Sequence, residues 1–307
     1  MIRCSIDKSI LIILSYLISH FALCQSKSEL FLTPSDTLNK QRRNAVVISE
    51  AALGTGALIG LNQLWYSDYE QSKFHTINDN SEWFQLDKLG HVASSYHIGR
   101  LGADVLNWSG VSKKDQLIYG ATLGLSFLTI VEVFDGYSEE WGFSWGDFAS
   151  NAAGSGIFIG QELLWDEQRI SLKYSFHQTK YSELRPERLG ENLLEQSLKD
   201  YNGQTYWLSA NVNSFIKKSK LPKWLNLAFG YGADGMLTGD EPITGSQFFE
   251  QKRMRQFYLS LDMDLERIES KSKLLKTIFK IINFIKIPAP AIEINSDGKI
   301  KFHYLYF

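Results

Sequence analysis

The spacing of apolar residues changes once along this chain, close to residue 168. Before that point, four segments show the 3.6-residue period of a helix, at about 44–66, 87–107, 113–135 and 144–165. After Arg169, apolar and polar residues alternate, as in a strand with two unlike faces. The sequence therefore predicts an α+β protein with a domain boundary at this change. A polar lead segment (25–43) precedes an N-terminal helical bundle (44–168), and a mainly antiparallel β-rich domain (169–307) follows.

The second half contains six segments with one apolar face and one polar or small face. They are 170–177, 206–213, 225–232, 257–265, 291–295 and 299–307. The last two are joined by Asp297-Gly298, a preferred hairpin turn. Strands of this kind that end in an aromatic residue, here Phe307, are typical of an outer-membrane β-barrel.

Six strands are fewer than the roughly eight that close a barrel. One interpretation is therefore a small or incomplete outer-membrane β-barrel, completed by the helices or by another chain. The alternative is a soluble antiparallel sheet packed on the helices, because burial of one face produces the same alternation.

The first and third helical segments are apolar enough to be considered as membrane-spanning helices. We disfavour that interpretation because many polar side chains would lie at membrane depth, where each costs roughly 2–3 kcal/mol unless paired. They are Glu50, Asn62, His91, His97, Arg100, Asp104, Glu132, Asp135 and Asn151. A bundle at the membrane surface fits better, and a polytopic inner-membrane protein is the alternative.

The segment 270–287 predicts a basic amphipathic helix. Lys273, Lys276 and Lys280 share one face of it, and leucines and isoleucines share the other. Such a helix can lie on an anionic lipid surface, with these lysines at the membrane interface. The alternative is a solvated lysine face over a stripe that packs in the core.

The first 24 residues predict a secretory signal peptide: a short charged opening, an apolar stretch from Ile10 to Leu23, and small residues before the cleavage point. Lipidation of Cys24 is the alternative, although Leu23 is a poor residue before a lipidated cysteine. Cys4 and Cys24 are the only cysteines, so a cleaved chain would have no thiol chemistry. We expect an exported protein of the cell envelope, at the outer membrane or its periplasmic face.

Charge and composition narrow the choice of partner. The chain carries 32 basic and 34 acidic residues, so it lacks the basic excess of a nucleic-acid-binding protein. Aromatic residues make up 13% of the chain, and aromatic side chains favour membrane interfaces. The expected partners are membrane lipid and an envelope protein, with no nucleic acid.

Three spaced polar motifs in the helical half carry the candidate chemistry. They are Asp87-Lys88-Leu89-Gly90-His91, Glu132-Val133-Phe134-Asp135, and the stretch from Gly142 to Gly154 that includes Ser144, Asp147 and Asn151. This order resembles the YfiM-like group of predicted periplasmic lipoproteins and, more distantly, the VanZ-like membrane proteins. The resemblance covers roughly residues 83–162. It implies an envelope location and a polar cluster shared among helices, and it implies no reaction.

Residues three or four apart share a helix face, so these motifs should turn three polar rows inward. The predicted polar cluster consists of Asp87, Lys88, His91, Glu132, Asp135, Ser144, Asp147, Asn151 and Gly154. Carboxylates and an imidazole within an apolar bundle must satisfy one another, because an unpaired buried charge costs several kcal/mol. A hydrogen-bonded network that fixes helix register, with Gly154 allowing close approach, is one interpretation.

The other interpretations of the cluster are functional. His91 could act as a base or ligand beside the carboxylates, or the cluster could bind a small ligand or a lipid headgroup. The sequence contains no H-E-x-x-H, zinc-spaced cysteine set, phosphate-binding glycine loop or nucleophile elbow. We therefore predict no metal and no cofactor. A structural or binding component of the outer membrane is favoured over an envelope enzyme that acts on lipid or cell-wall material.

Overall fold

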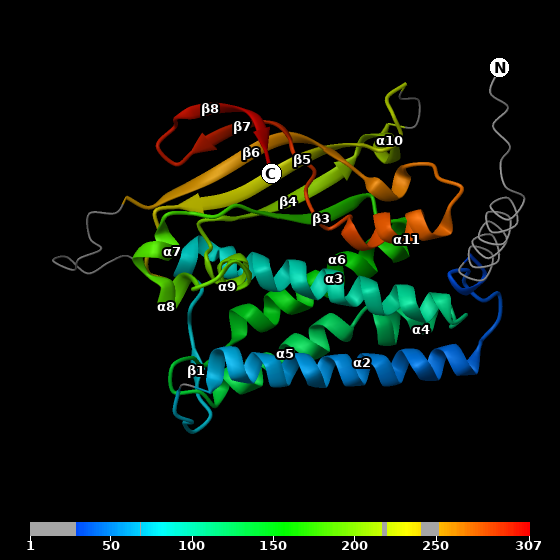
Figure 1. The fold of residues 1–307 in the computed structure, drawn as a ribbon, viewed down its shortest axis with the longest axis horizontal. Coiled ribbons are helices and arrows are strands. Elements are labelled where there is room, and N and C mark those ends of the chain that lie inside the picture. Colours follow the sequence, from blue (N-terminus) through cyan, green and yellow to red (C-terminus); the bar gives the residue numbers. More distant parts are fainter. Residues whose placement is uncertain (1–28, 68, 217–219, 241–251) are drawn as a thin grey trace, which may run out of the picture.

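The computed structural model describes residues 29–67, 69–216, 220–240 and 252–307. The predicted signal peptide lies outside these residues. Within them, a layer of helices lies against an antiparallel sheet (Figure 1). The predicted mixture of helix and antiparallel sheet is confirmed.

The long helices run along the long axis of the molecule (Figure 1). Their bounds are α2 Lys40–Leu61, continued by the π-turn η1 Asn62–Tyr66; α3 Leu86–Trp108; α4 Lys113–Asp115, η3 Gln116–Gly120 and α5 Leu123–Gly136 in succession; and α6 Trp145–Trp165. α3 packs against both α5 and α6, whereas α2 makes few contacts. α3 is therefore the centre of the helical layer.

Two helical stretches, Lys40–Leu61 and Lys113–Gly136, are long and apolar enough to cross a membrane. A core helix of a soluble protein can pass the same test, but such a helix is mostly buried. In Lys40–Leu61, only 6% of the most apolar 18-residue window is buried. In Lys113–Gly136, 28% of the corresponding window is buried. Both stretches thus expose apolar surface, including Ile48, Leu53 and Ile130.

The main sheet is a six-stranded antiparallel meander in the order β3-β4-β5-β6-β7-β8. The strands are β3 Ile170–Phe176, β4 Gln204–Asn211, β5 Leu225–Asp234, β6 Met254–Met263, β7 Ala289–Asn295 and β8 Ile300–Tyr306. The remaining elements are short: β1 Thr76–Ile77 paired with β2 Phe143–Ser144, η2 Glu82–Gln85, α7 Tyr181–Leu184, α8 Pro186–Leu189, α9 Leu193–Lys199, α10 Val212–Phe215, η4 Leu265–Arg267 and α11 Lys273–Ile282.

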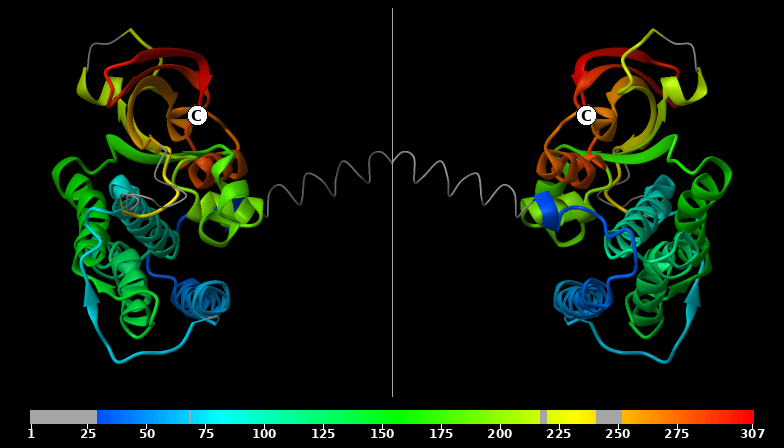
Figure 2. Two further views of the ribbon diagram at one scale, coloured as in Figure 1. Left: turned by 90° about the vertical axis from the view of Figure 1, so that its left-hand side faces the viewer. Right: turned by 90° about the vertical axis from the view of Figure 1, so that its right-hand side faces the viewer.

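The sheet curls away from the helices, so that β7 and β8 arch above β3 (Figure 2). The chain after α11 extends the β3 edge, because Tyr174 N donates to Phe284 O at 2.8 Å and Lys286 N donates to Tyr174 O at 2.9 Å. β3 and β8 nevertheless remain the ends of the strand order. The described residues therefore form an open curled sheet and not a closed barrel.

The outer face of the curled sheet is apolar and exposed. Cross-strand register places Leu208, Phe229, Leu259, Ile292 and Phe302 in one continuous row from β4 to β8. These five side chains are each between 43% and 55% exposed. The neighbouring rows add Leu227, Leu261, Phe257 and Ile294. Soluble monomers seldom expose a contiguous apolar patch of this extent.

The inner face of the same sheet is buried, and it holds charged and polar side chains beside aromatic ones such as Trp207 and Tyr258. Lys173, Asp262 and Lys286 are each at most 3% exposed. Lys173 Nζ lies 2.9 Å from Asp262 Oδ2, and Lys286 Nζ lies 3.8 Å from Asp262 Oδ1. Ser209 Oγ donates to Asp262 Oδ2 at 2.6 Å. The sheet is therefore inverted relative to a soluble sheet, with charges inside and leucines outside.

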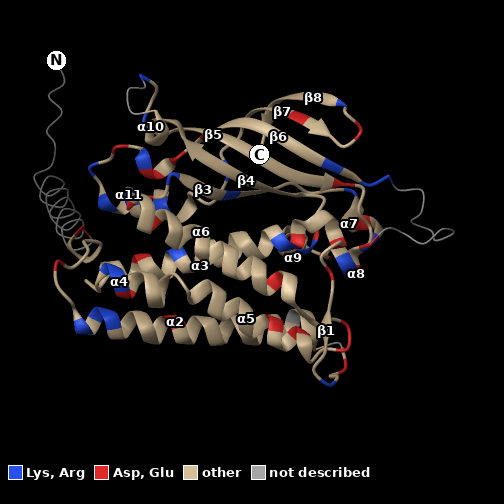
Figure 3. Ribbon diagram, turned by 180° about the vertical axis from the view of Figure 1, so that it is seen from behind, with Lys and Arg blue, Asp and Glu red and all other residues tan. Residues whose placement is uncertain are grey.

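Charged residues gather toward the two ends of the molecule (Figure 3). α2 carries basic residues at its N-terminal end and is otherwise nearly free of charge, and the middle of the sheet presents few charged residues (Figure 3). A zone with few charged residues thus separates two polar ends.

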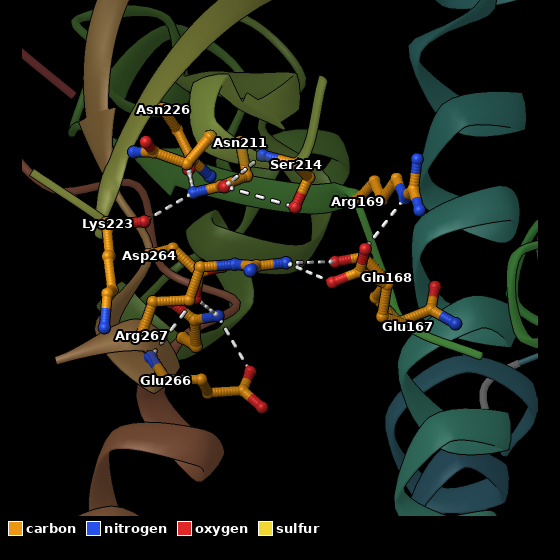
Figure 4. Close-up of polar contacts among 12 residues, drawn as sticks. Glu167, Gln168, Arg169, Asn211, Ser214, Lys223, Asn226, Asp264, Glu266 and Arg267 are labelled. Carbon is orange, nitrogen blue, oxygen red and sulfur yellow. Dashed lines mark hydrogen bonds and ion pairs between the residues drawn. The ribbon is translucent and has the colours of Figure 1, made fainter. Parts of the chain in front are cut away.

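A polar junction joins the end of α6 to the sheet. Arg267 of η4 contacts Glu167 Oε2 at 3.1 Å and Asp264 Oδ2 at 3.0 Å (Figure 4). On the sheet side, Asn211 Nδ2 donates to Asn226 Oδ1 at 2.8 Å (Figure 4). These contacts fix the helical layer against the strands at the end opposite to the candidate site described next.

Candidate functional site

Three long helices bring the predicted polar residues to one end of the helical layer. Asp87 lies in the first turn of α3, and Asp147 lies in the first turn of α6. Glu132 comes from the end of α5. A helix N-terminus carries a partial positive charge, so both aspartates lie where their charge is stabilised.

The sheet holds the turn from which α3 begins. Residues 83–85 all have positive φ, although none of them is glycine. Tyr231 Oη donates to Phe84 O at 2.7 Å, and the Arg255 guanidinium lies 4.3 Å from the Phe84 ring. Such conformations cost about 1–3 kcal/mol each unless the surroundings impose them. β5 and β6 therefore help to position Asp87.

Lys88 is the cationic centre of the cluster. Its Nζ lies 2.7 Å from Asp79 Oδ2, 2.8 Å from Asp147 Oδ1 and 3.0 Å from Asp87 Oδ2. Ser144 caps α6 by accepting from Asp147 N at 3.1 Å, and its hydroxyl donates to Asp79 Oδ1 at 2.6 Å. Three carboxylates thus surround one ammonium group.

His91 lies beside this ion-pair network. Its Nδ1 is 3.0 Å from Asn151 Oδ1, a hydrogen-bond distance at which the ring N–H donates to the amide oxygen. Its Nε2 is 3.7 Å from Asp147 Oδ1 and 4.0 Å from Asp87 Oδ1, too far for hydrogen bonds. The two ring nitrogens therefore have different environments.

Three buried polar atoms next to His91 have no hydrogen bond among the described residues. They are Glu132 Oε1, 3.7 Å from His91 Nδ1; Asp147 Oδ1, 3.7 Å from His91 Nε2; and Asn151 Nδ2. Glu132 is 1% exposed and Asn151 is fully buried, and the other carboxylate oxygen of Glu132 accepts from Ser144 N at 3.2 Å. An unpaired buried polar group costs about 1–3 kcal/mol. The hydrogen bonding of the cluster is thus incomplete.

The electrostatics of the cluster reflect an excess of carboxylates. Burial raises the pKa of Asp147, and the nearby charge of Asp87 adds to the rise. Burial also acts to raise the pKa of Asp87, but His91 and Lys88 outweigh it and the net pKa is lowered. For His91, burial lowers the pKa, while Asp87 and Asp147 more than reverse that effect and raise it.

Seven of the nine predicted residues meet in this cluster, and two do not. Asp135 points elsewhere, since Tyr66 Oη donates to its Oδ1 at 2.6 Å. Gly154 lies farther along α6, where it allows α3 to approach closely.

Sequence reasoning missed two members of the cluster. Asp79 precedes α3 in a loop, and Tyr201, from the loop before β4, donates its hydroxyl to Asp87 Oδ1 at 2.6 Å. Neither residue has a helical spacing that would have indicated it.

The lysines predicted for a membrane interface do not all face outward. Lys273 Nζ donates to Thr33 Oγ1, and Lys280 Nζ lies 2.6 Å from Asp104 Oδ1. Lys276 is exposed. The apolar residues of α11, including Leu274 and Ile281, are 53% and 61% exposed. α11 therefore turns its apolar stripe outward, like the sheet.

Residues 77–159 match the model of a family described as "Predicted periplasmic lipoprotein (DUF2279)". The matched residues contain all three polar motifs, so the family resemblance predicted from those motifs is confirmed over this quarter of the chain. The match supports an envelope location on the periplasmic side. No curated protein and no solved structure matches the chain.

Proposed function

We propose that this chain is an outer-membrane protein of binding or structural role. The outer face of its curled sheet, together with α2 and α5, faces lipid, and the polar cluster lies near one polar end. The observation that carries the proposal is the inversion of the sheet. Its exposed row from Leu208 to Phe302 is wholly apolar, while Lys173, Asp262 and Lys286 are buried behind it.

The dimensions of the apolar zone support this placement. β5 and β6 have 10 residues each and α2 has 22. At about 3.3 Å per strand residue and 1.5 Å per helix residue, each element is about 33 Å long, close to the roughly 30 Å of a bilayer core. The gathering of charges at the two ends of the long axis fits the same orientation (Figure 3).

The open sheet also indicates where a protein partner would bind. Unpaired backbone groups cost several kcal/mol each in lipid, so a free strand edge is unstable there. The chain after α11 adds to the β3 edge, whereas β8 ends the strand order. We infer that an envelope protein partner pairs with β8.

Separation of inner and outer membranes on a density gradient, after carbonate extraction, tests the proposal. We expect the protein in the outer-membrane fraction, resistant to extraction. Recovery in the soluble fraction would contradict a lipid-facing surface. Recovery in the inner membrane would instead favour the polytopic alternative.

An envelope enzyme is the second candidate. Asp87 and His91 favour it, because their side chains keep 24% and 19% exposure within the cluster. His91→Ala and Asp147→Asn, made separately, distinguish this role from a purely structural network. Loss of the envelope phenotype with intact folding supports a functional site, and collapse of folding in both variants supports the network.

A further inference from the structure

His91 has one ring nitrogen paired with an oxygen acceptor and the other beside two carboxylates. Its Nδ1 donates to Asn151 Oδ1 at 3.0 Å, so in the neutral ring Nε2 carries a lone pair, 4.0 Å from Asp87 Oδ1 and 3.7 Å from Asp147 Oδ1. Metal-binding histidines almost always donate their other ring N–H to an oxygen acceptor, which fixes tautomer and ring orientation.

The three ligand atoms have a suitable spacing. The imidazole nitrogen and one oxygen from each aspartate all lie within 4.8 Å of one another. A cation equidistant from atoms so spaced lies roughly 2.2–2.5 Å from each, close to the bond lengths of metal-bound imidazole and carboxylate. Lys88 also contacts these two aspartates. Its Nζ lies 2.8 Å from Asp147 Oδ1 and 3.0 Å from Asp87 Oδ2.

The charges and the unpaired oxygens of the cluster support a bound cation. Asp79, Asp87, Glu132 and Asp147 supply four carboxylates, and Lys88 is the one permanent cation among the described residues that contact them. Asp147 Oδ1, which lies 3.7 Å from His91 Nε2, and Glu132 Oε1 are buried without a hydrogen bond from any described residue. Buried carboxylates in excess of cations are costly unless protons or a cation neutralise them.

We propose that Asp87, His91 and Asp147 bind one divalent cation of the Mn²⁺ or Zn²⁺ class. One imidazole with two carboxylates is a donor set that suits these ions better than the all-oxygen sites of Ca²⁺. The proposal gives the binding role a ligand, and it does not depend on the membrane placement.

Titration of the purified full chain in detergent micelles with Mn²⁺ tests the site, with free Mn²⁺ measured by electron paramagnetic resonance. We expect one bound ion per chain. His91→Gln should weaken binding at least about 100-fold, more than the loss of an outer-shell partner costs. His97→Gln is the matched control, because it changes another histidine of α3 that contacts Leu172 O, and it should leave binding unchanged.

A second measurement keeps the proposal testable if His91→Gln does not fold. Pulsed electron paramagnetic resonance of Mn²⁺ bound to the unmodified chain should show coupling to one histidine nitrogen, and this coupling should change on ¹⁵N-histidine labelling. Absence of binding of both Mn²⁺ and Zn²⁺, equal binding by His91→Gln, or bound Mn²⁺ without nitrogen coupling would each overturn the site.

Discussion

Gly154 of α6 lies so close to Val92 of α3 that a Cβ built at Gly154 would be 2.2 Å from the Val92 carbonyl oxygen. The obstacle is backbone, so it cannot move aside without separating the two helices. Ser95 Oγ of α3 donates to Asn151 O at 2.6 Å in the same contact. The polar cluster depends on this close packing, because α3 and α6 supply most of its residues.

We therefore expect Gly154→Ala to destabilise the protein by about 1–3 kcal/mol through overpacking. Gly156→Ala is the control, since a Cβ there meets no atom of the described residues within 4 Å and replacing a helical glycine favours the helix. Denaturation in detergent micelles measures both. Equal stability of the two variants would show that α3 and α6 are not in close contact at Gly154.

Removal of the Lys88 ammonium should be more damaging. Lys88→Met leaves three carboxylates around an apolar side chain, and breaking a buried ion pair by removing one partner costs about 3–5 kcal/mol. Lys114→Met, at an exposed position, should change stability by less than about 0.5 kcal/mol. A Lys88→Met protein as stable as the control would mean that the carboxylates do not depend on this charge.

His97 should make the protein sensitive to mild acid. Burial lowers its pKa, as does the nearby charge of Arg100. The unfolded chain takes up a proton near the ordinary histidine pKa of about 6.5 and the folded chain only at lower pH, so stability falls as pH decreases below that value.

The test compares the unmodified chain with His97→Gln. Glutamine is chosen because its amide can still donate to Leu172 O, which lies 3.0 Å from His97 Nε2. We expect a shallower loss of unfolding free energy below pH 6.5 in the variant. Parallel pH profiles would show that His97 is not held neutral by its surroundings.

A charge on the outer face of the sheet should be costly in lipid. For Leu259→Lys we expect a loss of about 2–4 kcal/mol, the cost of lysine near the midplane on the lipid side of a membrane β-structure. Leu184→Lys in α7 is the control, at an exposed leucine near a polar end of the molecule. Unfolding from lipid vesicles measures the difference. A soluble sheet would tolerate both changes equally.

Much of the fold follows from sequence periodicity. The predicted strand 170–177 and the Asp297-Gly298 turn correspond to β3 and to the β7–β8 hairpin, where Gly298 has a φ of +77°. Periodicity cannot tell which face is buried, because an inverted sheet alternates just like a soluble one. The same ambiguity affects α11, for which the sequence leaves open whether the apolar side faces lipid or packs in the core.

The cluster was predictable where its residues share a helix. Asp87 and His91, four residues apart, both reach it, whereas Asp135 diverges from Glu132, because a three-residue step turns the side chain about 60° around the helix. Tyr201 could not be found this way, since it is brought to Asp87 from 114 residues away by packing of the sheet on the helices.

The most direct test of the central claim is an accessibility profile along β6. Single cysteines from position 257 to 262, in a chain without Cys4 and Cys24, would carry spin labels in lipid vesicles, with oxygen and a polar nickel complex as relaxation agents. We expect a two-residue period, with positions 257, 259 and 261 open to oxygen and closed to nickel, and 258, 260 and 262 closed to both. High nickel accessibility at 257, 259 and 261 would place that face in water and contradict a lipid-facing sheet.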